Sequence, residues 1–598
     1  MTLEYLTVGV YLVVLVVTGV VFSRFSRTAS DYVRAGGQGT WWIVGTSVIM
    51  AAISAFTFTG NGSAAYSAGP TFLVIYLANV IALAVGGCFL AGWFRQTRAH
   101  TTMDVVRARF GTAVEQFAVA TNVLLQPLGA SIQLWALAVF ASTTFGFPLR
   151  ETIVITGLIV VFYATLGGKW AVLANDFVQG IILFPITVLL AVLALHQVGG
   201  ISAFLGYFSD PRFARDFAWV KEPGQFPGDA FTVKWVVMIF LMQLYAQVSI
   251  TQAGRFLAAK DGREARRAAW LAAGLMVVGT LVWFVPPMVA RFMHAEAING
   301  LGVGKPAESA YAFIAARLLP NGLMGVMIAA MFAATLSSMD AGLNEQAGII
   351  VRNLIGRLRG FLGRPELAAG REVLLCRVIT LVLGTFVISM SLLLSAQDDF
   401  PLFEAYFVIA TTVGIPLGFP LLSGLWIRRL PPWAYPAIFG ACLLPSLYAL
   451  YDGKVHGTPW TIQDRTLWIF VFGIGATLAC ALLARFSSPA HRERERQFFA
   501  TLRRPVDFAA EVGESRDRAQ LVLLGRTVLV LSALLASLLF LPNPWTGRLA
   551  IAAVVTVTGL VGLGLVAAGR RMPGQPRPTE TGDRARALPA GAGETRQV

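Results

Sequence analysis

The sequence predicts an all-α polytopic membrane protein. Hydrophobic residues make up 56% of the 598 residues and charged residues only 13%, whereas soluble proteins contain roughly 45–50% apolar and about 25% charged residues. Apolar windows of about 20 residues, each long enough to cross a bilayer core about 30 Å thick, recur along the chain. This composition excludes a water-soluble enzyme and a disordered chain, and four cysteines are too few for a disulfide-stabilised scaffold.

Fifteen such windows predict about fifteen transmembrane helices. Their approximate boundaries are 5–23, 41–68, 71–95, 113–146, 150–167, 171–196, 231–256, 266–292, 320–355, 371–396, 400–428, 432–451, 465–486, 521–541 and 547–568. The first window follows Glu4 and precedes Arg24, Arg27 and Arg34, which reverses the charge order of a cleaved signal peptide. We therefore expect it to be a transmembrane helix with an outer N-terminus.

The distribution of basic residues supports this orientation. With alternate loops assigned to the two sides, the predicted cytoplasmic loops contain 36 of the 47 Lys and Arg residues and the outer loops contain 11. Cytoplasmic loops of membrane proteins collect Lys and Arg. We therefore expect a multi-pass protein of the cytoplasmic membrane, with its N-terminus outside and its C-terminus inside. The net charge of +15 is then an orientation signal, and we expect no nucleic-acid partner.

Three segments are predicted to lie outside the membrane. Residues 197–230 carry mixed charges, Pro and Gly and should form an external loop. Residues 487–520 contain the run HRERERQFF and should form a cytoplasmic connector. This connector is either a solvated linker, which the composition favours, or an interfacial basic helix. Residues 569–598 are rich in Pro, Gly and Arg and should be a disordered cytoplasmic tail.

Two windows have polar centres that predict interrupted helices. Window 41–68 contains AAISAFTFTGNGS, and window 231–256 contains QLYAQVSITQAG. Unwound backbone is tolerated in a bilayer only where it lines a cavity or is buried in protein. Interrupted helices at matching positions of two halves point to a transporter binding site. The halves would be 41–196 and 231–430. Because each half would contain five helices, the second half would have the inverted membrane topology. The alternative explanation is close helix packing through small residues.

A third polar cluster lies in window 320–355, where Ser337, Ser338 and Asp340 fall within two helical turns. A carboxylate inside the membrane is costly and suggests a functional role. A small hard cation prefers hydroxyl, carboxylate and carbonyl oxygens. The alternative for the serines is a hydrogen bond to a backbone carbonyl one turn earlier. Asp176 in window 171–196 is a second intramembrane acid. These residues predict a cation site between this window and the interrupted window 41–68.

These motifs resemble those of the sodium:solute symporter family, which includes bacterial sodium/galactose, sodium/proline and sodium/sialate transporters. The most specific matches are AAISAFTFTG followed by AAYSAG, NDFVQ, RFLAAKDGREARR and ATLSSMDAGLN. The resemblance covers roughly residues 5–430. It implies a LeuT-type core of two inverted five-helix repeats, 41–196 and 231–430. An N-terminal helix and first cytoplasmic loop in 1–40 would precede this core, and about four accessory helices would follow it in 431–486 and 521–568.

The resemblance also implies a sodium site and a gate. The sodium ligands would be the carbonyls of Met50, Ile53 and Ala334 and the hydroxyls of Ser337 and Ser338. Some members have a second sodium site with an acid that matches Asp176. Asp340 replaces a small or hydroxyl residue there, which implies a modified second sodium site or a proton site. Arg255 matches an arginine that is a cytoplasmic gate contact.

The substrate contacts match the family less well. Where the galactose transporter has Gln, Glu, Asn and Lys, this chain has Thr57, Tyr76, Met242 and Met276, whereas the gating tyrosine matches Tyr245. The residues predicted to line the substrate pocket are Thr57, Tyr76, Gln133, Gln243, Tyr245, Gln247 and Thr411. We therefore expect a small polar organic solute, sugar-like or another metabolite, bound by contacts that differ from those for galactose.

The sequence thus predicts sodium-coupled symport of a small polar solute by alternating access, with sodium as the coupling ion and no organic cofactor. Two alternatives remain open: a proton-coupled transporter that uses Asp340 and Asp176, and a non-transporting solute sensor. An enzyme is not expected, because none of the five histidines has a catalytic partner at motif spacing. The expected partners are the solute and the lipid bilayer, and the protein is expected to function as a monomer.

Overall fold

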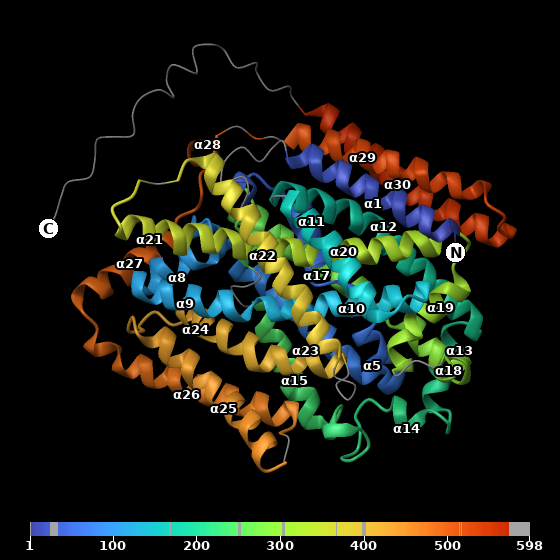
Figure 1. Ribbon diagram of the computed structural model, residues 1–598, viewed down its shortest axis with the longest axis horizontal. Coiled ribbons are helices and arrows are strands. Elements are labelled where there is room, and N and C mark those ends of the chain that lie inside the picture. Colours follow the sequence, from blue (N-terminus) through green and yellow to red (C-terminus); the bar gives the residue numbers. More distant parts are fainter. Residues whose placement is uncertain are drawn as a thin grey trace.

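The computed structural model consists of helices, and its longest helices run side by side along the long axis of the molecule (Figure 1). It describes residues 2–23, 34–166, 169–248, 253–301, 305–365, 367–396, 402–457, 460–513, 515 and 517–572. Within these residues, the one contact of β type is an isolated bridge between Gly39 and Ala259. The predicted all-helical class is therefore confirmed.

The described residues up to 198 form a succession of helices. These are α1 (Thr2–Ser23), α3 (Trp41–Ala51), α4 (Ala55–Phe58), α5 (Gly60–Ala68), α6 (Val74–Val85), α7 (Ala91–Gln96), α8 (Thr102–Phe110), α9 (Thr112–Leu125), α10 (Pro127–Phe145), α11 (Leu149–Leu166) and α12 (Lys169–Val198). A 3-10 turn joins α5 to α6 and a π-helical turn joins α6 to α7, so residues 55–96 are helical almost without interruption.

The segment 197–230 contains only the short helices α13 (Ile201–Gly206) and α14 (Ala214–Phe217) and two 3-10 turns. The helices that follow it are α15 (Val233–Val248), α16 (Ala253–Phe256), α17 (Gly262–Trp283), α18 (Val285–Asn299), α19 (Ala310–Leu318), α20 (Leu323–Ile349), α21 (Gly356–Phe361), α22 (Ala369–Ser395), α23 (Leu402–Ile409) and α24 (Ile415–Trp426). Two π-helical turns extend this set: η8 (Ile350–Ile355) joins α20 to α21, and η9 (Ala410–Gly414) joins α23 to α24.

The last part of the chain contains α25 (Ala434–Val455), α26 (Ile462–Leu483), α27 (Pro489–Arg503), α28 (Phe508–Glu511), α29 (Asp517–Ser537) and α30 (Trp545–Arg571). Helices α25 and α26 pack against each other, as do α29 and α30. The pair α29 and α30 packs against α12. In Figure 1 this pair lies on one side of the molecule, and α25 and α26 lie on the opposite side.

Eleven helical stretches of the described residues are long and apolar enough to cross a membrane. They are Ala55–Gln96, Thr112–Ser142, Lys169–Val198, Gly262–Asn299, Leu323–Phe361, Gly370–Ser395, Leu402–Trp426, Ala434–Val455, Ile462–Phe486, Asp517–Phe540 and Trp545–Arg571. Three shorter apolar helices, Leu6–Phe22, Trp41–Ala51 and Val233–Ala246, coincide with other predicted windows. The chain is therefore a multi-pass membrane protein.

The interruption predicted in window 41–68 lies between α3 and α4. Helix α3 ends at Ala51, and Ser54 has an extended backbone with φ −150° and ψ −179°. The Ser54 N–H then donates to the Thr57 hydroxyl over 3.3 Å, which is one half of a capping box at the start of α4. Ser and Thr favour helix N-termini because their hydroxyls satisfy backbone groups that lack an intrahelical partner.

Helix α20 is the most enclosed of the membrane-spanning candidates. Its apolar window is 94% buried, and it contacts α1, α3, α4, α10, α11, α12 and α22. A helix that is buried on all sides need not be amphipathic, and its polar residues must find partners inside the protein. The polar residues of α20 therefore contribute to the interior rather than to a lipid-facing surface.

The connector 487–520 is not the solvated linker that its composition favoured. Residues 489–503 form α27, whose buried side chains include His491, Phe498 and Leu502. This helix packs against α7 and α8. The prediction failed because the residues that form the buried face of this helix are few. They lie one or two turns apart among charged residues, so the composition of the segment does not indicate them. The tail from residue 573 onward, which was predicted to be disordered, lies outside the described residues.

Candidate functional site

A buried carboxylate joins three helices next to the break between α3 and α4. Asp176 of α12 is 0% exposed. Its two carboxylate oxygens accept hydrogen bonds from the hydroxyls of Ser47 on α3 and Ser337 on α20. Because a hydroxyl has one proton and two oxygen lone pairs, Ser337 keeps lone pairs for a cation, and Ser47 keeps one beside the one that accepts from Arg255. Three hard oxygen donors therefore converge at one point of the membrane interior.

Two further contacts tie this cluster to its surroundings. The Arg255 Nε donates to the Ser47 hydroxyl over 3.1 Å, so α16 contacts α3 at the same place. On the other side of the break, the Ala55 N–H donates to the Thr335 hydroxyl over 2.7 Å, which connects the start of α4 to α20. The broken helix is thus held against α20 on both sides of its interruption.

The backbone carbonyls predicted to bind sodium lie at this break and on the facing helix. Met50, Ile53 and Ala334 are each 0% exposed. The Ile53 N–H donates to the Met50 carbonyl over 3.3 Å, which is a tight turn at the end of α3. The Ser338 hydroxyl donates to the Ala334 and Thr335 carbonyls, each over 3.1 Å. The back-bonding considered as the alternative for the serines is therefore present at Ser338, whereas Ser337 bonds Asp176.

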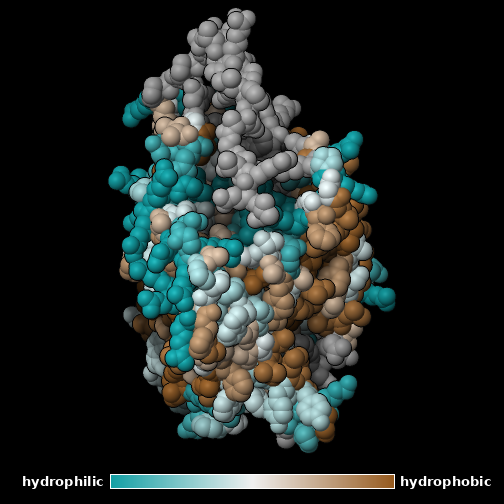
Figure 2. All heavy atoms as spheres, turned by 90° about the vertical axis from the view of Figure 1, so that its left-hand side faces the viewer, coloured by the Kyte–Doolittle hydropathy of each residue, from teal (hydrophilic) through white to brown (hydrophobic). Residues whose placement is uncertain are grey.

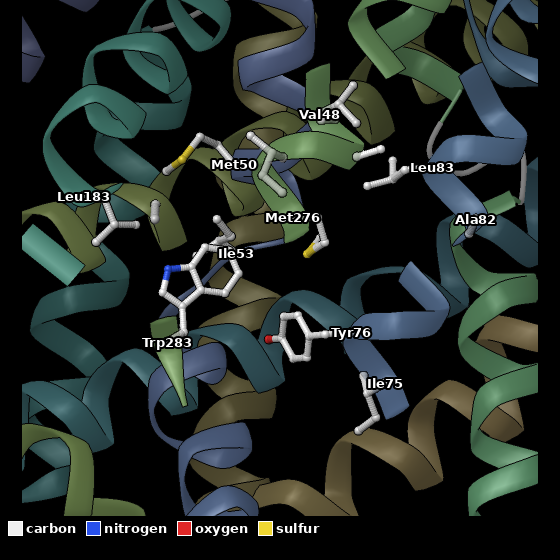
Figure 3. Packing of buried hydrophobic residues seen from close by; sticks show 14 of the residues in the cluster. Val48, Met50, Ile53, Ile75, Tyr76, Ala82, Leu83, Leu183, Met276 and Trp283 are labelled. Atoms are coloured by element: carbon white, nitrogen blue, oxygen red, sulfur yellow. The ribbon is translucent and has the colours of Figure 1, made fainter. Parts of the chain in front are cut away.

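One group of predicted substrate residues lies just after the break. The Asn61 side-chain amide donates to the Tyr76 hydroxyl over 3.0 Å, and the Thr57 hydroxyl lies within hydrogen-bonding reach of the same group. Tyr76 also contacts Trp283, with 6.0 Å between the ring centroids. In Figure 3, Tyr76, Met276, Ile53 and Trp283 border the same region of the interior. This region is lined by a methionine, aromatic rings and an isoleucine.

A second group lines a cavity of about 200 Å³ between α10, α15, α23 and α24. Its polar lining residues are Gln126, Gln243, Tyr245 and Tyr406. The Gln243 side chain hydrogen-bonds Tyr406, whose ring packs on Phe56 of α4 with 4.7 Å between centroids. The buried Tyr245 hydroxyl has no hydrogen-bond partner among the described residues, although its ring stacks on Phe419 over 5.2 Å. A buried hydroxyl without a partner is available to a ligand.

The structure does not bring all predicted residues together. Gln133 is not among the described residues that line this cavity. The Thr411 hydroxyl donates over 2.8 Å to the Phe407 carbonyl, one turn earlier in the chain. Its proton is therefore used in a local hydrogen bond. The side chains of Asp340 and Gln247 lie outside the part of the chain that the structure describes, although their backbones belong to α20 and α15.

Five site residues were not predicted: Ser47, Asn61, Gln126, Thr335 and Tyr406. Ser47 precedes Met50 by three residues, so it lies on the same helix face, and this spacing was an available signal. Asn61 is a polar residue in the interrupted window 41–68 and was also recognisable. Thr335 precedes Ser337 by two residues in the polar cluster of window 320–355, and Tyr406 lies between Glu404 and Thr411 in window 400–428. Only the packing of their helices against α4 gives them a role.

The comparisons with known proteins agree with this site. A model of the sodium:solute symporter family matches residues 32–432. The chain is 23% identical to a sodium/sialic acid symporter of Proteus mirabilis over 491 residues, which are 81% of this chain and 95% of that protein. It is 24% identical to sodium/glucose cotransporter 1 of Ovis aries over 463 residues, 70% of this chain and 67% of that protein.

A solved structure has a similar fold. It is a Na⁺-coupled sialic acid symporter in a substrate-bound outward-open state, and it covers 81% of this chain and 98% of its own. The TM-score is 0.67 at 19% sequence identity. At this identity the likeness shows a common fold.

Proposed function

The chain belongs to the sodium:solute symporter family, and we propose that its coupling sodium ion binds at the break between α3 and α4. Because the family and the relatives are symporters, the chain is a sodium-coupled solute transporter and not an enzyme. The ligands of the ion would be the carbonyls of Met50, Ile53 and Ala334 and the hydroxyls of Ser337 and Ser338.

The observation that carries this proposal is the Asp176 cluster. Sodium is a hard cation for which carbonyl, hydroxyl and carboxylate oxygens are suitable ligands. Ser337 donates to Asp176 and Ser338 donates to the Ala334 carbonyl, so both hydroxyls present lone pairs rather than protons to an ion. A negative carboxylate directly behind Ser337 raises the attraction of the site for a cation in a low-dielectric interior. We propose Asp176 as a shared element of this site and of a second cation site that includes Asp340.

The test is thermal unfolding of purified protein in sodium chloride and in equal potassium chloride. An ion that binds only the folded state raises stability by RT ln(1+[L]/Kd), about 2.7 kcal/mol at 100 times Kd. We expect a sodium-specific rise in Tm that becomes smaller in Ser337→Ala and in Ser338→Ala. The control is Ser446→Ala, because Ser446 is a buried serine of α25 whose hydroxyl has no partner among the described residues.

Equal sodium-induced shifts in all these variants would refute the site. An absent sodium shift, accompanied by uptake driven by a pH gradient alone, would replace sodium coupling with proton coupling through Asp176 and Asp340.

We propose a neutral, hydroxyl-rich solute as the substrate. The polar residues that line the cavity between α10, α15, α23 and α24 are amides and phenols, and none of its described lining residues is charged. A buried carboxylate needs a cationic or multiply hydrogen-bonding partner, whereas sugar hydroxyls pair well with amides and phenols. The unpartnered Tyr245 hydroxyl supplies one such contact, and Gln243 supplies another. The relatives are named for two solutes, sialic acid and glucose. Of these two, a glucose-like molecule fits this lining better.

Sodium-driven uptake into proteoliposomes tests the substrate class. We expect uptake of labelled glucose or a related neutral sugar, and weak competition by sialic acid. Tyr245→Phe and Gln243→Ala should each raise KM about tenfold, because a lost hydrogen bond costs roughly 1–1.5 kcal/mol. Tyr435→Phe is the matched control, since Tyr435 is a buried tyrosine on α25 that packs on Phe117 outside the cavity. Preference for sialic acid over neutral sugars would contradict the proposal.

We also propose the transport cycle that this arrangement supports. Sodium would join α3, α4 and α20 in an outward-open state, and the solute would then close the outer side around Tyr76 and Tyr245. Arg255, which contacts Ser47, would hold the inner side until the ion leaves. The membrane potential contributes about 2.3 kcal/mol per charge per 100 mV. In this proposal the two five-helix units, 41–196 and 231–430, form a LeuT-type inverted repeat within about fifteen crossings.

A further inference from the structure

A basic cavity lies at the end of the molecule that carries α27. The start of α1 and the end of α12 lie at the opposite end (Figure 1). Its volume is about 820 Å³, and it lies between the ends of α24 and α26 and the helix α27. Six arginines and one glutamate contribute to its lining: Arg428, Arg429, Arg485, Arg492, Arg496, Arg503 and Glu495. All six arginines are exposed to solvent. This end of the chain is the one that the arginine distribution predicts to be cytoplasmic.

The glutamate of the cavity does not neutralise these arginines. Glu495 forms an ion pair with Arg109 at 2.9 Å, and Arg109 is a separate, 2% exposed residue behind the cavity. The Leu430 N–H also donates to Glu495, over 3.1 Å. Burial alone would raise the pKa of Glu495. Its contacts with His491, Leu430 and Arg109 together outweigh this effect, so the pKa lies below its usual value. Glu495 is therefore a charged anchor that fixes α27 to the end of α24.

The arginines of the cavity have few acidic partners. Within the described residues, only Arg496 among the six has a carboxylate within 4 Å, that of the exposed Glu493 at 3.6 Å. Several unpaired arginines around one cavity repel one another unless an anion is bound. Arginine also binds phosphate through two parallel N–H groups, which makes phosphate groups its natural ligands.

The apolar surroundings indicate what carries the phosphate. Leu482 lines the cavity and is 77% exposed, and Phe486 and Leu478 of the same region are 71% and 58% exposed. Leu478 and Leu482 lie on the last turns of α26, and Phe486 ends the 3-10 turn that follows it. The stretch Ile462–Phe486 is apolar enough to cross the membrane. Figure 2 shows this end of the molecule, where hydrophilic side chains gather on the left-hand side and border hydrophobic ones on the right and below. The cavity therefore adjoins a surface suited to acyl chains.

We propose that this cavity binds the phosphate headgroup of an anionic phospholipid from the cytoplasmic leaflet. Basic pockets between membrane helices on the cytoplasmic side bind such headgroups. The headgroup phosphate lies among the cavity arginines, and the acyl chains run along Leu482 and Leu478 of α26. Since α27 packs on α7 and α8, the bound lipid holds the connector helix against the transport core.

The test measures the Tm of the purified full chain in detergent with added lipid. Phosphatidylglycerol and phosphatidylcholine with identical acyl chains are compared, together with free glycerol 1-phosphate. We expect phosphatidylglycerol to raise Tm by about 3 °C, as roughly 1 kcal/mol of stabilisation does in a large chain. Phosphatidylcholine and glycerol 1-phosphate should have little effect.

The variant is Arg429→Gln with Arg503→Gln, and the matched control is Arg570→Gln with Arg571→Gln. Both pairs are exposed and both remove two positive charges from the predicted cytoplasmic side. The lipid-induced rise should disappear in the first pair and persist in the second. If the first pair is poorly folded, Arg503→Gln alone is measured by counting bound lipids in native mass spectrometry, where we expect fewer than in wild type.

Three results would overturn the proposal. An equal lipid-induced rise in both double variants would place lipid binding elsewhere on the protein. A full rise with glycerol 1-phosphate alone would identify a free anion as the ligand. A rise of the same size with phosphatidylcholine would show a general detergent or lipid effect without headgroup recognition.

Discussion

Asp176 accepts hydrogen bonds from the hydroxyls of Ser47 on α3 and Ser337 on α20. We expect Asp176→Asn to raise the sodium concentration for half-maximal uptake about tenfold or more. The amide keeps the size of the side chain but loses its charge, and interactions with a charged group are worth about 1.5–3 kcal/mol. The measurement is sodium-dependent uptake of the identified solute.

The control for this variant is Asp464→Asn. Asp464 also interacts with a cation, Lys234, but its side chain is 37% exposed and lies at the start of α26. An unchanged sodium dependence in Asp176→Asn would remove Asp176 from the cation site and leave it as a structural link between α3, α12 and α20.

His100 gives the protein a specific sensitivity to acid. It lies between α7 and α8, where burial first and then the charges of Arg34 and Arg352 lower its pKa from 6.5 to about 4. Between these two values the unfolded chain binds a proton that the folded chain does not bind, so stability falls as the pH decreases from about 6.5 to about 4. The loss should be about 1 kcal/mol after allowance for solvent screening.

We expect His100→Asn to lack this part of the acid sensitivity. The measurement is the difference in Tm between variant and wild type at pH 7, 6, 5 and 4.5. The difference should change in favour of the variant as the pH falls. Asp104, whose pKa is lowered by Arg352 and Arg107 in spite of its burial, loses its contribution only at lower pH. A constant difference across this range would show that His100 is protonated equally in both states.

A single amide joins three helical elements near the predicted cytoplasmic ends. Asn353 lies in the π-helical turn η8 and is 1% exposed. Its amide donates to Asp104 of α8 over 3.1 Å and to Glu115 of α9 over 2.6 Å. Its carbonyl oxygen accepts from the Thr101 hydroxyl over 3.1 Å, and Thr101 is the N-cap of α8.

We expect Asn353→Ala to destabilise the protein by about 2–4 kcal/mol. The substitution leaves the buried Glu115 carboxylate without its hydrogen-bond donor and removes one of the donors to Asp104, which keeps the His100 and Thr101 N–H groups. The loss of a partner costs more than the hydrogen bond itself. Thermal unfolding and limited proteolysis between α7 and α8 are the measurements. Gln497→Ala, which removes an exposed amide from α27, should change Tm by much less. Equal effects of the two substitutions would contradict a central role for Asn353.

Hydropathy predicted the helical membrane class well because a spanning helix is a local property of about 20 residues. The interruption at 52–54 was also a local signal, since Ser54 is followed at once by Thr57, Thr59 and Gly60. Tyr406 was missed because its role arises only where α23 meets Phe56 of α4 and Gln243 of α15. The helix α27 was missed because its buried residues are few and separated by arginines. Contacts between distant segments thus limit prediction from sequence.

The whole molecule has an uneven distribution of charge between its two ends. Basic α27 and the C-terminal ends of α24, α26 and α30 carry many of the arginines. The segment 197–230 carries few, and it lies away from α27 in Figure 1. Positive residues are retained on the cytoplasmic side during insertion. The structure thus keeps apart the two loop sets that we assign to opposite sides of the membrane.

Labelling of single cysteines in intact cells tests this orientation. In a background with the four native cysteines replaced, Glu222→Cys should react with a membrane-impermeant maleimide, because Glu222 is exposed in the predicted external segment. Gln497→Cys, exposed on α27, should react only after the cells are permeabilised. The opposite pattern would invert the topology, and with it the side from which sodium enters. It would also move the arginine-lined cavity to the outer leaflet, so the orientation and the lipid proposal would be revised together.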